Sequence, residues 1–221
     1  MPNIPSPYIK RSRRQSIALQ VTPGGELIVN APLFTPNFII NQFIQRKSDW
    51  ILDTLQKISI KKVRSKEYKE GEEFWYEGLP RELKFYDGIE VAVREDEILF
   101  PIALRFRIHK ELTDWFIRQA RNRISQRVSY HAGKMNARYK SLLFSDTKTK
   151  WGTCGPDNSL QFNWRLIMAP LMVMDYVVIH ELAHTKEKNH GINFWREVGK
   201  YTPAFKQHRK WLNSNNHLLT V

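Results

Sequence analysis

The stretch Val177-Val178-Ile179-His180-Glu181-Leu182-Ala183-His184 ends an apolar run with the pattern His-Glu-x-x-His. If this run is a helix, His180 and His184 lie one turn apart and project from the same face. Two imidazoles at that spacing can share one tetrahedral metal ion, and Glu181 beside them can reach a water next to the ion. The pattern therefore predicts a zinc hydrolase.

A pair of structural histidines is the alternative interpretation of this pattern. The chain has seven histidines in 221 residues, and so short a pattern also arises by chance. The residues before the motif are apolar apart from Asp175, which indicates a buried helix. A buried helix does not carry two histidines and a glutamate without partners, because unpaired buried polar groups are costly. We therefore favour a metal site.

The third ligand of such a site can come from either of two residues further along the chain. Glu187 lies within about 20° of His180 on a continued helix, but three ligands in a row suit a tetrahedral ion poorly. His190 avoids this problem if the chain turns near Asn189, a residue that tolerates the left-handed conformation at a helix end. We expect His190 to be the ligand and Glu187 to be solvated or to support a ligand.

Several motifs around this helix resemble one known family. They are Trp151-Gly152-Thr153-Cys154, residues 163–170 (NWRLIMAP), residues 175–184 (DYVVIHELAH), Asn189-His190 and Phe194-Trp195. In these motifs the chain is similar to the YgjP-like metallopeptidases, which are predicted bacterial metal-dependent hydrolases related to the SprT-like proteins and other minimal zincins. The resemblance extends over nearly the whole chain and is weaker at the N-terminal end, where residues 13–17 carry it. Thr153 stands where the family usually has serine and keeps the hydroxyl.

The resemblance implies an α+β fold with a zincin-like metallopeptidase core, in which the motif helix packs beside a small sheet. It implies Zn²⁺ on His180, His184 and His190, and Glu181 as the catalytic residue that activates water for attack on a peptide bond. The expected partner is thus a peptide or protein substrate. In metallopeptidases of this kind an edge strand beside the metal pairs with an extended peptide, and our candidate for that strand is Leu160–Leu166.

Other residues bear on the enzyme hypothesis. A Cys154 thiolate as a fourth protein ligand would close the metal site and make it structural rather than catalytic. Negative charge that develops on a substrate oxygen needs a hydrogen-bond donor. The downstream candidates for that donor are Tyr201, His208 and Arg209.

The composition is that of a basic chain without a disulfide. Cys154 is the single cysteine, which fits a reducing cytoplasm. Met1–Pro5 lacks the apolar core of a signal peptide. The longest apolar run, Leu166–Ile179, is too short for a membrane span and is broken by Pro170 and Asp175. We therefore expect a cytoplasmic protein without a membrane partner.

The net charge of +13 suggests a second function. The densest basic groups are Lys10–Arg14, Lys61–Arg64 and the set Arg118, Arg121, Arg123 and Arg127 on a predicted helix. The alternative is therefore a nucleic-acid-associated protein of the SprT-like kind, whose metal site cleaves DNA-bound proteins or is structural. Solvated faces of amphipathic elements explain the same charges, so we expect nucleic-acid binding through this basic surface to be weak.

Hydrophobic periodicity divides the chain into two parts. Residues 1–105 are predicted to form a mostly β subdomain with one helix. Its elements are a hairpin of residues 17–31 turning at Pro23-Gly24-Gly25, a helix that begins at Thr35-Pro36 and reaches Ile58, and strands near 74–76, 83–85, 91–93 and 98–100.

Residues 106–221 are predicted to form the metallopeptidase domain. Its elements are a helix over 109–136, strands over 141–146 and 160–166, the motif helix after Pro170, and a helical stretch over 192–211 that breaks near Thr202-Pro203. The apolar residues Phe194, Trp195 and Val198 indicate that this last stretch packs back on the motif helix.

Overall fold

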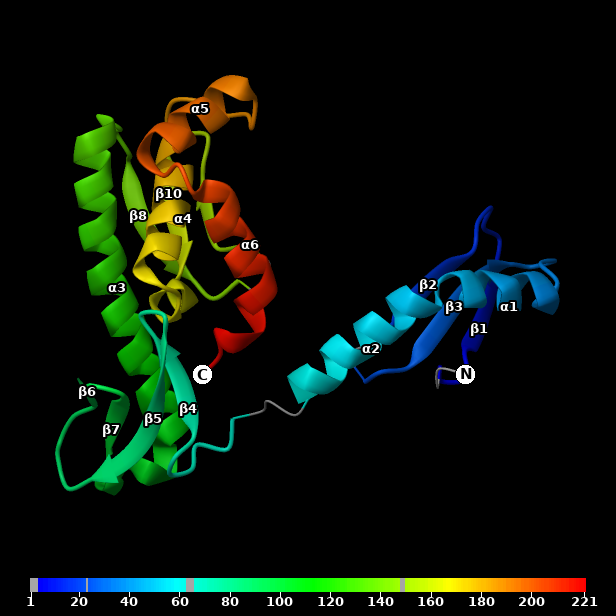
Figure 1. The fold of residues 1–221 in the computed structure, drawn as a ribbon, viewed down its shortest axis with the longest axis horizontal. Helices are drawn as coiled ribbons and strands as arrows, with labels where there is room; N and C mark the ends of the chain where they lie inside the picture. Colours follow the sequence, from blue (N-terminus) through cyan, green and yellow to red (C-terminus); the bar gives the residue numbers. More distant parts are fainter. Residues whose placement is uncertain (1–3, 23, 63–65, 148–149) are drawn as a thin grey trace. The chain divides into compact units, whose positions relative to one another are not determined.

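The computed structural model describes residues 4–22, 24–62, 66–147 and 150–221, and the chain divides into two compact units, residues 1–65 and 66–221 (Figure 1). Some residues named above lie outside the described part: Met1–Asn3, Pro23, Val63, Arg64 and the side chains of Ile58, Lys61 and Lys62.

The division between the units falls at residue 65 rather than at residue 105, where the periodicity predicted it. The strands between residues 73 and 101 bury side chains in the same core as the motif helix, among them Phe74, Leu83, Ile98 and Phe100. These strands therefore belong to the second unit. Periodicity identifies a strand but does not say which core its buried face contacts.

The first unit contains a sheet of three strands in the order β1-β3-β2. The strands are β1 (Tyr8–Ser12), β2 (Ala18–Val21) and β3 (Leu27–Pro32). The pairing of β2 with β3 is antiparallel, which confirms the predicted hairpin, and β1 pairs with β3 in parallel. Gly25 in the connection has a φ of 88°, a left-handed conformation that favours glycine.

Two helices follow this sheet where the sequence predicted one. They are α1 (Asn37–Arg46) and α2 (Ser48–Lys62). The break lies at Lys47, whose N–H donates to the carbonyl of Ile44 at 3.0 Å, a tightened last turn. The first helix starts at Asn37 with Pro36 as its N-cap, and no side chain caps it. The inward faces of both helices complete a separate small core with the sheet.

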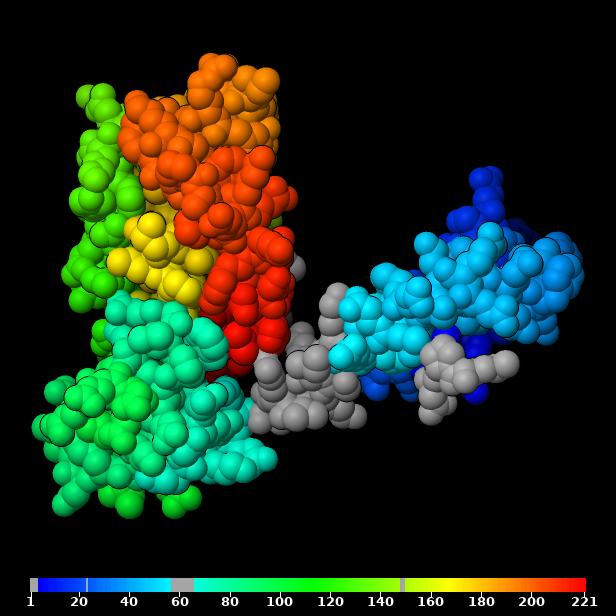
Figure 2. Space-filling view, viewed as in Figure 1, coloured from blue at the N-terminus to red at the C-terminus, as the bar shows by residue number. Residues whose placement is uncertain are grey.

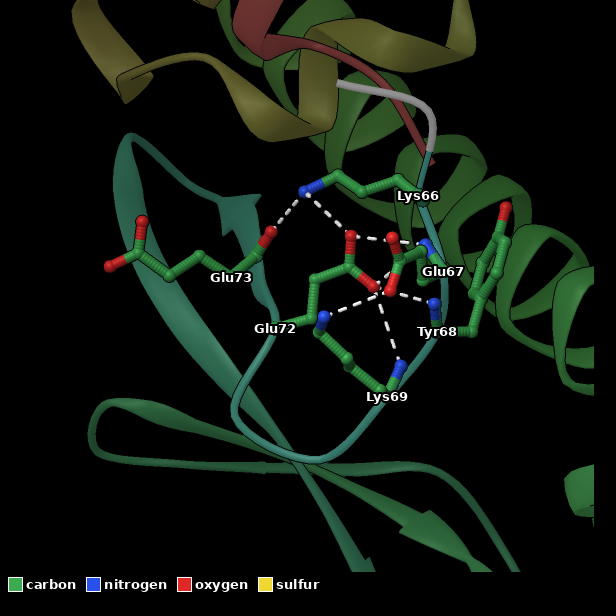
Figure 3. A network of polar contacts seen from close by, with 6 residues as sticks. All are labelled: Lys66, Glu67, Tyr68, Lys69, Glu72 and Glu73. Atoms are coloured by element: carbon green, nitrogen blue, oxygen red, sulfur yellow. Dashed lines mark hydrogen bonds and ion pairs between the residues drawn. The ribbon is translucent and has the colours of Figure 1, made fainter. Parts of the chain in front are cut away.

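The second unit begins with a polar network around the Glu72 carboxylate (Figure 3). This carboxylate accepts hydrogen bonds from three backbone N–H groups, those of Glu67 at 3.0 Å, Tyr68 at 2.5 Å and Lys69 at 3.4 Å. The Lys66 ammonium lies 4.0 Å from the same carboxylate and donates to the carbonyl of Glu73. Because Glu72 directly precedes the first strand of this unit, the network joins the entering segment to the sheet.

The first sheet of this unit has four strands in the order β4-β5-β7-β6. They are β4 (Glu73–Tyr76), β5 (Leu79–Tyr86), β6 (Ala92–Arg94) and β7 (Glu97–Pro101), which confirms the four predicted strands. The two-residue turn between β4 and β5 has φ values of 49° at Glu77 and 87° at Gly78. Positive φ at both positions is typical of a type I′ hairpin turn.

This turn packs against the residues that lead into the motif helix, α4 (Leu171–Ala183). The N–H groups of Glu77 and Gly78 donate to the carbonyls of Ile167 at 2.8 Å and Met168 at 3.1 Å. A Cβ atom on Gly78 would lie 2.6 Å from the Cα of Pro170. The turn therefore holds the start of α4 in place and leaves no room for a side chain at Gly78.

A short 3₁₀ helix, η1 (Ile102–Arg107), leads into the long helix α3 (Ile108–Met135), which confirms the helix predicted for residues 109–136. Its apolar stripe is buried along the whole length of the helix, at Leu112, Trp115, Phe116, Ala120, Ile124, Val128 and Met135. The helix runs alongside α4 (Figure 1). It ends at Asn136, which has a left-handed φ of 48°.

The arginines of α3 do not all present free charge. Arg123 forms an ion pair with Glu77 at 2.8 Å, and Arg127 pairs with Asp175. Half of the predicted basic stripe is therefore neutralised within the unit. Binding of nucleic acid by the remaining basic surface stays a prediction.

The second sheet has three strands in the order β8-β10-β9. They are β8 (Ser141–Ser145), β9 (Gly152–Cys154) and β10 (Ser159–Asn163). The prediction of an edge strand over Leu160–Leu166 is wrong, because β10 lies in the centre and the chain turns into the 3₁₀ helix η2 (Trp164–Met168) after Asn163. The edge strand that contacts α4 is β9, in a segment whose glycine and short length suggested only a turn.

The chain ends in helices that pack on α4. They are α5 (Ile192–Tyr201) and α6 (Phe205–Asn215), and the 3₁₀ helix η3 (Asn216–Leu218) follows and contacts α6. Phe194 and Val198 are buried and Trp195 packs against the same core, so α5 packs back on the motif helix as predicted. The predicted break near Thr202-Pro203 separates α5 from α6. Within the described residues, no helix has the length and apolar character needed to cross a membrane.

A buried ionic network joins α4 to α3. The Asp175 side chain is 10% exposed and accepts hydrogen bonds from Arg127, from Nε at 2.6 Å and from Nη2 at 2.7 Å. Nε2 of His131 lies 3.2 Å from the same carboxylate. Burial acts to raise the pKa of Asp175, but the hydrogen bonds and charges of His131 and Arg127 outweigh it and hold that pKa below its ordinary value.

We expect Asp175→Asn to lower the free energy of unfolding by about 1–3 kcal/mol, because the partly buried Arg127 guanidinium loses its charged hydrogen-bond partner. The carboxylate stabilises the fold above the pKa of the unfolded chain, and this contribution is lost as the pH falls through the lower folded pKa. The difference between wild type and variant should therefore shrink in acid. Urea unfolding at several pH values measures this.

The matched control is Asp114→Asn, which removes an exposed pair with Lys110 at 2.7 Å. No measurable change is expected there, because exposed ion pairs contribute little. Equal stability of wild type and the Asp175 variant at neutral pH would contradict a stabilising role for the network.

Candidate metal centre and active site

Two histidines of the motif lie at the C-terminal end of α4. His180 occupies the last turn and His184 is the C-cap residue, and their ring centroids are 5.0 Å apart. The chain turns directly after His184 through hydrogen bonds such as that from the Lys186 N–H to the Ala183 carbonyl at 3.0 Å. The turn thus precedes Asn189, which does not adopt the predicted left-handed conformation.

The turn brings a third imidazole to the same point. Nε2 of His190 lies 3.1 Å from Nε2 of His180 and 3.2 Å from Nε2 of His184. Tetrahedral zinc with Zn–N bonds of about 2.0–2.1 Å separates its nitrogen ligands by about 3.3 Å. The three nitrogens therefore lie close to the spacing that one such ion requires, and they form the one metal-compatible cluster found among the described residues.

Neighbouring groups orient these rings. Nδ1 of His184 lies 3.0 Å from the Glu187 carbonyl, and donation of Nδ1–H to this oxygen leaves the Nε2 lone pair free to bind a metal. Glu187 thus supports a ligand through its backbone, not through its carboxylate. Phe194 stacks on His184 with centroids 4.4 Å apart, and Trp195 stacks on His190 at 5.7 Å. Helix α5 therefore fixes the planes of two imidazoles.

The surroundings of the histidines favour neutral rings. Burial, with the positive charges of His184, His190 and Arg209, lowers the pKa of His180 to about 3. Burial also lowers the pKa of His184. Nδ1 of His180 is buried and has no hydrogen-bond partner among the described residues. Neutral imidazole is the form that binds a metal ion, so the protonation state fits the geometry.

Glu181 lies beside the triad and is 5% exposed. Burial raises its pKa to about 8, while the Lys150 charge acts in the opposite direction. Its carboxylate makes no hydrogen bond or ion pair with any described residue. A cation at the triad would favour its ionised form, since an opposite charge nearby lowers the pKa of a carboxyl group.

Strand β9 approaches Glu181 more closely than a side chain would permit. A Cβ atom on Gly152 would lie 2.7 Å from Cγ, 2.8 Å from Oε1 and 3.0 Å from Cδ of Glu181. A side chain at this position would therefore force the Glu181 side chain to move. The Trp-Gly-Thr-Cys motif contained this residue, but periodicity alone gave no sign that its backbone borders the site.

We expect Gly152→Ala to lower the free energy of unfolding by about 1–3 kcal/mol, because the new methyl group overpacks the contact with Glu181. The control is Gly133→Ala, since nothing lies within 4 Å of that position inside α3. Alanine should stabilise the helix there by up to about 1 kcal/mol. Thermal and urea unfolding compare the two, and an equal effect of both substitutions would contradict the close approach.

A cleft of about 200 Å³ opens beside His180 and Glu181. Strand β9, helix α4 and helix α6 contribute its walls, including Gly152, Tyr176, Arg209 and Asn213. Of the three oxyanion candidates, only Arg209 lines this cleft, and Tyr201 and His208 do not. The cleft residues Lys150 and Asn213 were not expected, because no local motif marks them. Tyr176 lies within the motif of residues 175–184, but the motif gave it no role.

Cys154 does not join the converging imidazoles. Its Sγ lies 3.6 Å from the Gly155 carbonyl and 3.8 Å from Nζ of Lys188. The cluster of potential ligand atoms among the described residues contains the three histidines without a sulfur atom. A closed site of three histidines and one cysteine is therefore not what the described residues form.

Three imidazoles beside a buried carboxylate and an open cleft are typical of metal-dependent hydrolases. The model of the YgjP-like, metallopeptidase domain family matches residues 15–215. The chain belongs to this family, which implies a divalent metal that the histidine triad is suited to bind. Neither the curated proteins nor the solved structures with which the chain was compared gave a match.

Proposed function

We propose that the chain is a zinc-dependent metallopeptidase, with His180, His184 and His190 as the metal ligands and Glu181 as the general base. The main support is the convergence of three Nε2 atoms at 3.1–3.2 Å next to a carboxylate that pairs with no described residue. A structural histidine cluster has no need of a buried, unpaired glutamate. The cleft also leaves space for a substrate beside His180 and Glu181.

Zinc is the ion that three neutral imidazoles suit best, although cobalt, nickel and iron accept the same donors. When bound, the ion supplies Lewis-acid polarisation of a substrate carbonyl and a lowered pKa of a water. We also propose the zincin arrangement for this core. Helix α4 then provides His180 and, at its C-cap, His184, while His190 comes from the segment before α5. The edge strand beside this helix is β9.

The residues of the chain account for the proton movements of amide hydrolysis. The Glu181 carboxylate takes a proton from water as the water oxygen forms its bond to the carbonyl carbon. The same group then gives this proton to the leaving nitrogen as the C–N bond breaks. Arg209, the oxyanion candidate that lines the cleft, would donate a hydrogen bond to the carbonyl oxygen as negative charge develops there.

The proposed substrate is an extended peptide that adds as a strand to β9. Within the described residues β9 pairs with β10 on one side, and no strand pairs with its other edge. Main-chain hydrogen bonds to such an edge bind a peptide with little dependence on sequence. The contact between Gly152 and Glu181 places this edge beside the proposed general base.

We expect Glu181→Gln to retain the metal and to lower kcat for peptide cleavage by about 10²–10⁴-fold, the usual contribution of a general base. Metal analysis and a peptide-library digest measure the two properties on the same preparation. The control Glu90→Gln changes an exposed glutamate of the same unit and should keep wild-type activity. A Glu181 variant that cuts peptides at the wild-type rate would refute the mechanism.

We expect one divalent ion per chain, with a cobalt-substituted form that shows the visible absorption of a tetrahedral site. His190→Ala should lose most of this binding, because one of the three nitrogen ligands is removed. The control is His217→Ala, which changes a histidine outside the triad. Chelator treatment should abolish cleavage and zinc should restore it. Full metal content in the His190 variant would rule out this residue as a ligand.

A further inference from the structure

A second hollow, which we call the α5–α6 pocket, opens between helices α5 and α6. It has a volume of about 710 Å³ and is lined by Trp195, Phe205, Lys206, Arg209, Lys210 and Asn213, together with Ser214. Residues of α5 and α6 (orange and red) form part of the surface of the second unit in Figure 2. The proposed peptidase chemistry uses none of these groups apart from Arg209.

The side chains around this pocket carry positive charge and no negative charge. Lys206, Arg209 and Lys210 occupy positions i, i+3 and i+4 of α6, which places them on one face of the helix. No ion pair or hydrogen bond joins any of the three to another described residue. An anion that enters the pocket would therefore not compete with an existing carboxylate.

The floor of the pocket is apolar and reaches the metal site. Trp195 and Phe205 stack with centroids 5.1 Å apart and planes 18° apart. The same Trp195 stacks on His190, so one aromatic ring separates the pocket from the triad. Arg209 and Asn213 line both the pocket and the cleft. The two hollows therefore adjoin along α6 at Arg209 and Asn213.

We propose that the α5–α6 pocket binds a carboxylate of the peptide substrate, supplied by an acidic side chain or by the peptide C-terminus. Cations bind the carboxylate, and the aromatic floor contacts the methylene groups that carry it. A peptide is favoured over a nucleic acid because the cations gather in one pocket beside the cleft, whereas a phosphate backbone is followed by an extended basic surface. This inference rests on the proposed peptidase function.

The first experiment compares cleavage of matched peptides by the zinc-loaded protein. One Glu is moved through the peptide, and each peptide has a Gln counterpart and versions with a free or amidated C-terminus. We expect the best Glu or free-terminus peptide to exceed its uncharged counterpart about tenfold in kcat/KM, mainly through KM, as two or three exposed charge contacts permit. Loss of the preference on amidation identifies the C-terminus as the source, and loss on Glu→Gln identifies the side chain.

The double variant Lys206→Gln/Lys210→Gln should reduce this preference to within about twofold of unity, because it removes the two cations that line only the pocket. Arg121→Gln is the control, since it removes an exposed positive charge from α3 at a distance in sequence from the pocket. An unchanged preference in the double variant would overturn the inference, and so would equal cleavage of charged and uncharged peptides by the wild type.

Binding by Glu181→Gln separates the inference from the proposed function. Fluorescence anisotropy of labelled peptides should show tighter binding of the carboxylate peptide, and the double substitution should remove the difference. If no peptide is cleaved but this binding pattern persists, the proposed peptidase function fails and the carboxylate pocket stands. Binding of a single-stranded oligonucleotide that depends on Lys206 and Lys210, without binding of acidic peptides, would overturn the inference.

Discussion

The burial of α4 is the constraint on which the rest of the second unit depends. This helix is apolar around most of its circumference, so each polar residue that it carries needs a partner. Asp175 has Arg127 and His131. The imidazoles of His180 and His184 meet a third at His190, in the arrangement that suits a cation. The Glu181 carboxylate has no hydrogen-bond or ion-pair partner among the described residues, and an unpaired buried carboxylate is tolerated best where it has chemistry to perform.

The position of Glu181 depends on a second constraint, the absence of a side chain at Gly152. Because β9 lies directly against this carboxylate, the free edge of the sheet and the proposed general base border the same cleft. The two-residue turn at Glu77-Gly78 has a corresponding effect at the other end of α4, where it packs against Pro170. A glycine thus lies close to the motif helix at both places, Gly78 against the Pro170 backbone before its start and Gly152 against the Glu181 side chain in its last turn.

The sequence predicted the parts of this structure that depend on local pattern. Residue spacing indicates the apolar stripe of α3 and the four strands β4, β5, β6 and β7. It also indicates the meeting of His180, His184 and His190. It did not predict that β9 is the edge strand, that the units divide at residue 65, or that Asp175 pairs with Arg127. Those features arise from contacts between segments far apart in the sequence. Arg127 and Asp175, for example, are 48 positions apart.

In the proposed peptidase, discrimination between substrates must come from a part of the site other than the sheet edge. Strand addition uses main-chain hydrogen bonds that every peptide can supply, and the narrow cleft beside Glu181 is occupied by the reacting amide in the proposed chemistry. Side chains on either side of that amide need other contacts. The α5–α6 pocket offers cations without competing carboxylates and shares Arg209 with the cleft. We therefore expect α6, next to the proposed metal site, to select substrates by their negative charge.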